Sequence, residues 1–298
     1  MLNQGTIIKT IPPEGKLIKI PTGIASFDTI IRGGFPSGSL ILLMGETGAG
    51  NIEFAYTSLS MLSLLRSNTE LYGSTRKQLE SFMSINEDLK LPDTVCYISF
   101  SYSKDDIRKE LEHSFPVGFL EAFDNKGFVF KDLSSFYPEC TTPQINNTWK
   151  GIKGTKDEGK QLILKELIST LEFNARNGLV IIDSLASLRR VCCLEWTDLL
   201  YFIEELQKRS KKWDGLIFLT LGSGIFRKNQ EEEIMDIADS VLVFEWALEG
   251  FTRQQTLYIQ KSRGVLPNII KDNMVRFDTV VSNTDGFVVT NVKRISGR

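Results

Sequence analysis

The stretch LILLMGETGAGN, residues 40–51, joins a short apolar run to a glycine-rich turn. The run at 40–45 has the length and continuous hydrophobicity of a strand that is buried on both faces of a parallel sheet. The residues after the turn predict a helix over about 52–65. A strand, a glycine-rich turn and a helix in this order are the context of a phosphate-binding P-loop, in which backbone N–H groups and the helix start hold phosphate oxygens.

The bulk composition is that of an ordinary globular protein. Of the 298 residues, 42% are hydrophobic and 24% are charged, which suits one large α/β domain. The formal net charge of −2 argues against a protein whose main task is to coat nucleic acid. No apolar segment opens the chain and no apolar run reaches about 18 residues, so we expect a soluble, cytoplasmic protein without membrane attachment.

Cysteine and histidine do not form a metal-binding pattern in this sequence. The four cysteines contain no C-x-x-C pair, and the single histidine, His113, has no ligand cluster around it. We therefore expect no metal site built from these residues.

Short apolar runs recur along the chain and alternate with segments of helical pattern. The further runs lie at 94–100, 178–183, 215–221 and 240–245. Three more β-like runs follow near the end of the chain, and they read QTLYIQ, NMVRFD and FVVTNV. Strands that alternate with helices predict an α/β fold, a mainly parallel twisted sheet flanked by helices. The last three runs predict a C-terminal antiparallel edge.

The remaining segments suggest how the chain is organised. We expect residues 1–20 to form an N-terminal arm or hairpin and residues 21–298 to form one domain. Two polar stretches, near 66–93 and 139–158, have the composition of surface insertions. The segment between the runs that end at 221 and begin at 240 reads as a polar loop.

The glycine-rich turn lacks the side chains of a working P-loop. A lysine at position 51 would reach the β- and γ-phosphates and a hydroxyl at 52 would hold Mg²⁺, but the sequence has Asn51 and Ile52. Glu53 adds a negative charge to the first helical turn, where it competes with a phosphate. Losing one charged hydrogen bond of about 1.5–3 kcal/mol weakens triphosphate binding by roughly ten- to a hundredfold.

On this stretch alone, a tight glycine turn without a ligand is the alternative to a nucleotide site. If the turn does hold nucleotide, its binding residues are Gly45, Glu46, Thr47, Gly48, Ala49, Gly50, Asn51 and Ile52.

Four stretches resemble the KaiC-like branch of the RecA/RadA superfamily of P-loop ATPases. Residues 21–50, PTGIASFDTIIRGGFPSGSLILLMGETGAG, are similar to the family segment in which a T-G-I-x-x-F-D motif and a G-G-x-P-x-G turn precede the P-loop. LVIIDSLASL resembles the second nucleotide motif, and IADSVLVF and YIQKSRG resemble the late strands and the K-x-R-G segment. The resemblance covers about residues 20–298. It implies a RecA-like fold with a degenerate Walker A motif.

The resemblance also implies roles for residues outside the turn. Asp183 stands where the family orders Mg²⁺ through water, and a carboxylate left over at the sheet edge is the alternative. Lys261 and Arg263 stand where the family reaches across a ring interface toward the γ-phosphate of a neighbour, and a merely solvated basic pair is the alternative. Ser101 and Tyr102 occupy the positions at which active relatives carry glutamates.

The lysine, the metal-binding hydroxyl and the catalytic acid of an active P-loop ATPase are all absent. Asp105 and Asp106 do not replace the acid, because we expect them only to start the next helix. We therefore expect no catalytic residues, no metal, and either no cofactor or weakly bound ATP or ADP. The leading interpretation is a non-hydrolysing regulatory or assembly subunit, a pseudo-ATPase. It would associate with itself or with an active RecA- or KaiC-like relative.

Two alternative functions belong to other classes. A weak ATP-binding protein or slow ATPase would use backbone N–H groups and a lysine from elsewhere, such as Lys77 or Lys104. A DNA-binding accessory factor similar to RadA paralogues would use basic loops after Asp183 and Thr220. The cations of these loops are Arg189, Arg190, Arg227 and Lys228, and Glu231–Glu233 offset them.

Overall fold

The computed structural model of the 298-residue chain describes residues 18–67, 88–125, 127–134, 156–263 and 274–295. Most of the expected N-terminal arm and of the two expected polar insertions lies outside these residues. The division of the chain at residue 20 therefore stays a prediction.

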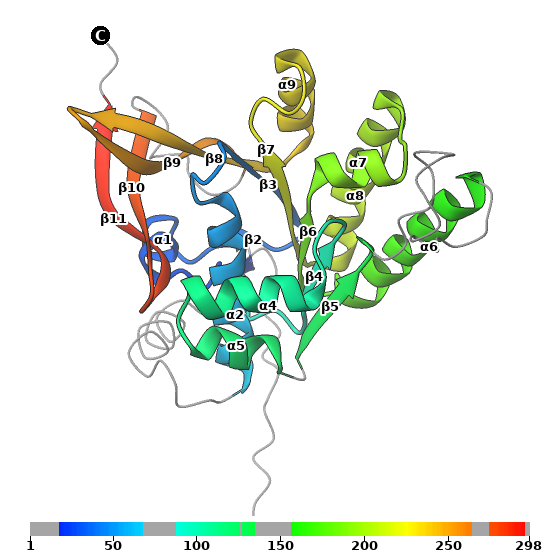
Figure 1. The fold of residues 1–298 in the computed structure, drawn as a ribbon, viewed down its shortest axis with the longest axis horizontal. Coiled ribbons are helices and arrows are strands. Elements are labelled where there is room, and N and C mark those ends of the chain that lie inside the picture. Colours follow the sequence, from blue (N-terminus) through cyan, green and yellow to red (C-terminus); the bar gives the residue numbers. More distant parts are fainter. Residues whose placement is uncertain (1–17, 68–87, 126, 135–155, 264–273, 296–298) are drawn as a thin grey trace, which may run out of the picture.

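A nine-stranded sheet forms the centre of the molecule (Figure 1). Six neighbouring strands run parallel, and in spatial order they are β8 (Ser240–Glu249), β3 (Ser39–Gly45), β7 (Leu216–Gly222), β6 (Leu179–Asp183), β4 (Val95–Ser99) and β5 (Phe128–Asp132). The five apolar runs that the sequence marks as buried strands become β3, β4, β6, β7 and β8. The predicted mainly parallel sheet is confirmed.

Three antiparallel strands extend the sheet on the β8 side. They are β9 (Thr252–Ser262), β10 (Met274–Ser282) and β11 (Gly286–Ile295). Figure 1 shows these strands turning away from the parallel part to stand beside α1 and α2. The predicted antiparallel edge is confirmed, and it brings β11 to the face that carries α1 and α2.

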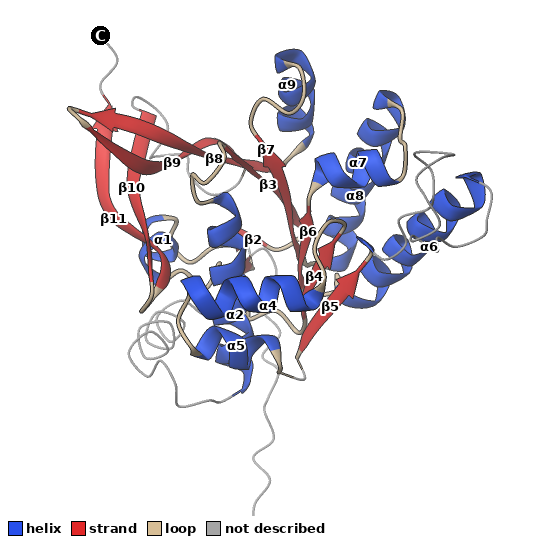
Figure 2. Ribbon diagram, viewed as in Figure 1, coloured by secondary structure: helices blue, strands red, loops and turns tan. Residues whose placement is uncertain are grey.

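Helices cover both faces of the sheet (Figure 2). Side chains alternate along β3, so that Ile41 and Leu43 belong to one apolar cluster and Leu40 and Leu42 to the other. The first face carries α1 (Ala25–Ile30), α2 (Asn51–Ser67), α4 (Lys104–Ser114) and α5 (Gly118–Phe123). The second face carries α6 (Lys156–Asn174), α7 (Leu185–Val191), α8 (Trp196–Trp213) and α9 (Lys228–Ile237). Among the described helices, none has both the length and the apolarity needed to cross a membrane.

The start of α4 follows from local sequence. The Ser103 hydroxyl accepts a hydrogen bond from the Asp106 N–H at 3.3 Å, and the Asp106 carboxylate accepts one from the Ser103 N–H at 3.0 Å. This reciprocal pair is a capping box. Asp105 and Asp106 therefore begin a helix, as the sequence predicts.

Two helices form where the sequence analysis expected loops. The segment before β8 is not wholly a polar loop, because α9 occupies its second half, and α7 begins two residues after Asp183. In α9, Ile234 is buried, and the buried Glu231 carboxylate accepts the Gly224 N–H at 2.8 Å. The segment is short and mostly polar, so its composition is that of a loop, although its few apolar residues lie on one helical face. The loop prediction is wrong for that reason.

A short segment ahead of the glycine-rich turn is held by one buried carboxylate. Strands β1 (Lys19–Ile20) and β2 (Phe35–Pro36) pair as a small separate sheet on either side of α1. Asp28 of α1 accepts hydrogen bonds from the Thr22 N–H at 2.8 Å, the Thr22 hydroxyl at 2.8 Å and the Gly23 N–H at 2.9 Å. The T-G-I-x-x-F-D motif thus closes the turn between β1 and α1.

Candidate functional site

The glycine-rich turn lies at the carboxyl ends of the parallel strands, where ligands of open α/β sheets bind. Residues 46–50 connect β3 to α2, which begins at Asn51. Gly48 has φ of +72° and Gly50 has φ of +109°, backbone conformations that side chains other than glycine rarely adopt. The turn therefore has the predicted strand–loop–helix context.

Carbonyl groups of the turn are held by the chain itself. The Trp246 indole N–H donates to the Thr47 carbonyl at 3.1 Å, and the Gln255 amide donates to the Gly48 carbonyl at 2.8 Å. The Glu46 carboxylate accepts the backbone N–H of Trp246 at 3.0 Å. Trp246 on β8 and Gln255 on β9 are register partners in the hairpin. The β8–β9 hairpin thus fixes the turn, and Glu46 serves as a structural acceptor.

The backbone N–H groups of the turn, unlike its carbonyl groups, are mostly without a hydrogen-bond partner among the described residues. Within the described part of the chain, the backbone N–H groups of Gly48, Gly50, Asn51 and Ile52 have no hydrogen-bond acceptor. Backbone N–H groups at the start of a helix are the part of a P-loop that contacts phosphate. The turn therefore offers free backbone donors, and phosphate binding by these groups stays a prediction.

At position 51, where a P-loop has its lysine, the Asn51 side chain packs against the turn itself. Asn51 is only 7% exposed, and a Cβ added to Gly45 would lie 2.6 Å from the Asn51 Cγ and 2.7 Å from its Oδ1. The Asn51 amide is therefore folded back over the end of β3. It carries no charge with which to replace the missing lysine.

The last glycine of the turn packs against the C-terminal edge of the sheet. A Cβ on Gly50 would lie 2.9 Å from the ring of Phe287 on β11. That ring lies 5.4 Å from Phe54 of α2 and 5.8 Å from Phe244 of β8, centroid to centroid. The antiparallel edge thus takes part in shaping the turn, which the sequence analysis did not foresee.

Asp183, at the end of β6, is buried, and both of its carboxylate oxygens accept hydrogen bonds. The Tyr97 hydroxyl donates to Oδ2 at 2.6 Å and the Thr220 hydroxyl donates to Oδ1 at 2.8 Å. Burial raises the pKa of Asp183, and the two hydrogen bonds lower it by a smaller amount. Next to Tyr97, the Tyr56 hydroxyl donates to Glu110 at 3.3 Å, and burial raises the pKa of Glu110.

These residues do not suit a bound magnesium ion. Ile52 has no ligand atom, and Asp183 is buried with a hydroxyl of the protein donating to each of its oxygens. Among the described residues, no three carboxylate, histidine or cysteine side chains are placed to hold a metal.

The two positions at which the sequence resemblance implies catalytic acids carry hydroxyls in ordinary contacts. The Ser101 hydroxyl donates to that of Ser187 at 2.8 Å, and the N–H groups of Ser101 and Tyr102 point to the Ser99 hydroxyl. The Tyr102 side chain is half exposed. No carboxylate replaces the missing acids at these two positions.

Lys261 lies near the end of β9 and Arg263 directly after it, away from Gln255, the β9 residue that contacts the turn. Lys261 donates to the Met235 carbonyl at 3.0 Å and to the Asp236 carbonyl, at the end of α9. Arg263 is more than half exposed, with its guanidinium 4.0 Å from Asp239 Oδ1. The structure does not bring this pair to the glycine-rich turn of its own chain. Their action on a neighbouring chain stays a prediction.

Cations near the turn differ from those the sequence analysis considered. Lys104 lies 5.4 Å from the Phe123 ring centroid and 4.0 Å from Asp124, both in the α5 region, and Lys77 lies outside the described residues. Arg253 stacks 4.7 Å from the ring centroid of Trp246, which holds the turn. Arg253 precedes Gln255 by two positions on β9 and so points to the same face of the hairpin. Only the hairpin register could have identified it.

The basic residues considered for DNA binding are partly used inside the fold. The Arg189 guanidinium lies 5.9 Å from the Trp196 ring and 5.7 Å from the Phe226 ring, and its Nε donates to the Leu194 carbonyl at 3.2 Å. Arg190 is exposed and donates to Ser187. Arg189 therefore joins α7 to α8 and to the loop before α9, which leaves fewer cations for phosphate contacts.

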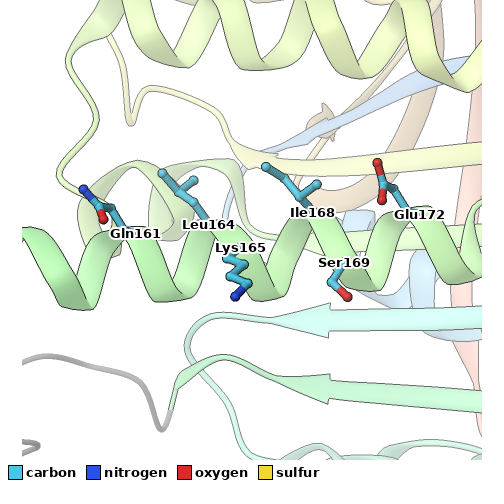
Figure 3. A pocket seen from close by; sticks show the side chains of 6 residues that line it. All are labelled: Gln161, Leu164, Lys165, Ile168, Ser169 and Glu172. Carbon is cyan, nitrogen blue, oxygen red and sulfur yellow. The ribbon is translucent and has the colours of Figure 1, made fainter.

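A hollow of about 440 Å³ lies along α6, away from the glycine-rich turn (Figure 3). Figure 3 shows Leu164 and Ile168 pointing to one side of the helix and Lys165 and Ser169 to the other. Among the described residues, its lining comes from α6 alone. This one-sided surface has no convergent polar groups of the kind that define a small-molecule site.

The fold has counterparts among solved structures. The crystal structure of the KaiC-like protein PH0186 from Pyrococcus horikoshii OT3 covers 92% of this chain and 100% of its own, with 18% identity and a TM-score of 0.56. The flagellar accessory protein FlaH from Methanocaldococcus jannaschii covers 89% and 95%, with 16% identity and a TM-score of 0.57. No known family model and no curated protein matches the chain. At these identities the likeness concerns the fold alone, and the chain has the RecA-like fold of these KaiC-like and FlaH structures.

Proposed function

We propose that this chain is a non-hydrolysing regulatory or assembly subunit that keeps a RecA-like fold and associates with itself or with an active relative. The observation that carries the proposal is the state of Asp183, whose two oxygens accept hydrogen bonds from Tyr97 and Thr220. The inward-folded Asn51 supports the same conclusion. At Asp183 and at position 51, side chains of the protein take the places that a metal ion and a lysine would occupy.

Phosphoryl transfer depends on positioning and on neutralisation of the phosphate charge. The lysine, the metal ligand at position 52 and the acid after β4 would provide these effects, and none is present. The lysine contact alone is worth about 1.5–3 kcal/mol, and the loss of the metal ligand and of the acid adds to it, which leaves little catalysis. We infer a pseudo-ATPase with no catalytic residues.

Weak nucleotide binding without turnover is the second candidate function. It is favoured by the N–H groups of Gly48, Gly50, Asn51 and Ile52, which face no acceptor among the described residues, and by Arg253 above the Trp246 ring. An arginine stacked on an aromatic ring keeps its charge and its donors. Any ATP or ADP bound there would be held mainly by backbone groups and without magnesium.

Association is supported by the tip of the β8–β9 hairpin. Leu248 is 77% exposed and Phe251 is fully exposed, and two large apolar side chains at one tip favour contact with another protein. One structure of the same fold is named an accessory protein, which supports an accessory role by fold analogy alone. Binding of DNA has weaker support because Arg189 is enclosed by aromatic rings. A cytoplasmic location belongs to the same proposal.

The test combines an ATPase assay with nucleotide titration and light scattering. The unmodified protein should release no phosphate above a buffer blank, and Asn51→Lys with Ile52→Thr should restore binding more than hydrolysis. Turnover of about 1 per second or faster by the unmodified protein would refute the proposal. A monomer at every concentration, with no co-elution with RecA-fold ATPases of the same organism, would refute the assembly role.

A further inference from the structure

The tyrosine beside Asp183 lies on the neighbouring strand and is set there by strand register. Ser99 of β4 is the partner of Asp183 of β6, and Tyr97 is the partner of Ile181. Because side chains two positions apart share a face, Tyr97 and Asp183 lie on the same side of the sheet. This is the face that also carries α2 and the glycine-rich turn.

Tyr97 is rigidly placed for this contact. Its side chain is fully buried, its ring stacks on Phe130 with 5.9 Å between centroids and 6° between planes, and its other neighbour is Tyr56 at 5.7 Å. The hydroxyl reaches Asp183 Oδ2 at 2.6 Å, a short distance typical of a hydrogen bond to a carboxylate. The ring positions leave the hydroxyl little freedom to move away from the carboxylate.

We propose that Tyr97 is a specificity-determining residue that keeps a divalent cation from Asp183. A magnesium ion retains several water molecules and binds carboxylates through them. Tyr97 takes one lone pair of Oδ2 and Thr220 takes one of Oδ1, on a carboxylate that is only 7% exposed, so a metal-bound water would have to compete with these hydroxyls for Asp183. The site therefore excludes the metal at two points, at Ile52 by the lack of a ligand and at Asp183 by a protein hydroxyl. This inference deepens the proposed function and rests on it for its biological meaning.

One consequence distinguishes this block from the changes in the turn. Asn51→Lys and Ile52→Thr should restore a phosphate contact and one magnesium ligand, neither of which needs Asp183. The contribution of Asp183 should stay silent until the Tyr97 hydroxyl is removed. Tyr97 and Asp183 should then be coupled in their effect on the magnesium dependence of ATP binding.

The experiment is a double-mutant cycle in the Asn51→Lys/Ile52→Thr background. The four chains carry no further change, Tyr97→Phe, Asp183→Asn, or both, and ATP affinity is measured by calorimetry with Mg²⁺ and with EDTA. Tyr97→Phe should raise the magnesium ratio, the ATP affinity with Mg²⁺ divided by that with EDTA, by about tenfold or more, the value of one charged hydrogen bond. Asp183→Asn should abolish that gain, but should change nothing while Tyr97 is present.

A matched control is Tyr258→Phe, which also removes a hydroxyl that donates to a carboxylate, that of Glu245 at 3.3 Å, on β8, three strands away from β6 in the sheet. It should leave the magnesium ratio unchanged. Equal ratios with and without the Tyr97 hydroxyl would overturn the inference. If Tyr97→Phe fails to fold, the Asp183→Asn chain decides, because a lower ratio there would show that Asp183 is available to metal while Tyr97 is in place. Hydrolysis by the unmodified protein would refute the proposed function and leave this cycle interpretable.

Discussion

Asp28→Asn should change how the stability of the fold depends on pH. Asp28 has no exposed surface, and burial raises the pKa of its carboxyl to about 7, against the lowering effect of the hydrogen bonds from Thr22 and Gly23. The folded state thus binds a proton more tightly than the unfolded chain does. The contribution of this proton to stability is complete below about pH 4 and is lost as pH rises through 7.

The magnitude follows from the pKa values. Between pH 5 and pH 8 the carboxyl of the folded protein passes from mostly protonated to ionised, whereas that of the unfolded chain is ionised throughout. The starting pH of 5 lies about two units below the folded pKa, so about two units of proton binding are lost. At about 1.36 kcal/mol per unit, the carboxyl should cost about 2 to 3 kcal/mol of unfolding free energy over this range. The amide that replaces the carboxyl in Asp28→Asn does not titrate, so the variant should lack this loss.

The assay is urea unfolding of the wild type and of Asp28→Asn at pH 5 and pH 8. Between pH 5 and pH 8 the wild type should lose about 2 to 3 kcal/mol more unfolding free energy than the variant. The control is Asp105→Asn, at an exposed position in the first turn of α4, for which the difference should stay constant. A difference for Asp28→Asn that is equal at both pH values would refute the reasoning.

Three further outcomes are expected. Gly50→Ala should lower the free energy of unfolding in urea by about 2 kcal/mol or more, because the new Cβ would sit at a strained positive φ and against the Phe287 ring. Gly224→Ala is the control, since Gly224 also has a positive φ but lies in open space, and it should cost about 1 kcal/mol. Arg253→Ala should weaken any ATP binding by about threefold to tenfold in calorimetry, and an unchanged affinity would remove Arg253 from the site. Lys261→Ala should lower the free energy of unfolding by about 1 kcal/mol, because it removes the contacts of Lys261 with the carbonyls at the end of α9. Arg263→Ala should lower it by less than about 0.5 kcal/mol, and equal losses for the two variants would contradict this prediction.

The parallel sheet was predictable because its strands carry a local signal. Runs such as 178–183 and 215–221 are apolar throughout since each strand is buried on both faces, and such runs are short and flanked by helical patterns. β5, α7 and α9 lack this signal. Only one residue of β5 is fully buried, and α9 buries Ile234 beside a charged residue. Their structure depends on what they pack against.

The candidate site was predictable only in its deficits. Asn51 and Ile52 can be seen in the sequence, because a P-loop has fixed spacing from its glycines. Tyr97 could not be identified, since it reads as one more apolar residue of a buried strand until the β4–β6 register places it beside Asp183. Trp246 and Gln255 are about 200 residues from the turn they hold, and such distant contacts have no local pattern.

The contacts of the site explain why the turn persists without its ligand chemistry. In a working P-loop, a lysine and a carboxylate are both charged groups that a nucleotide and its metal complete, so removing the ligand leaves them unpaired. Here Asn51 is neutral, and Asp183 is satisfied by two hydroxyls. The turn is also tied to the β8–β9 hairpin through Trp246. We therefore expect nucleotide-free protein to be fully folded, with a melting temperature that ATP raises by less than about 2 °C, and a much larger rise would show that the cradle still depends on its ligand.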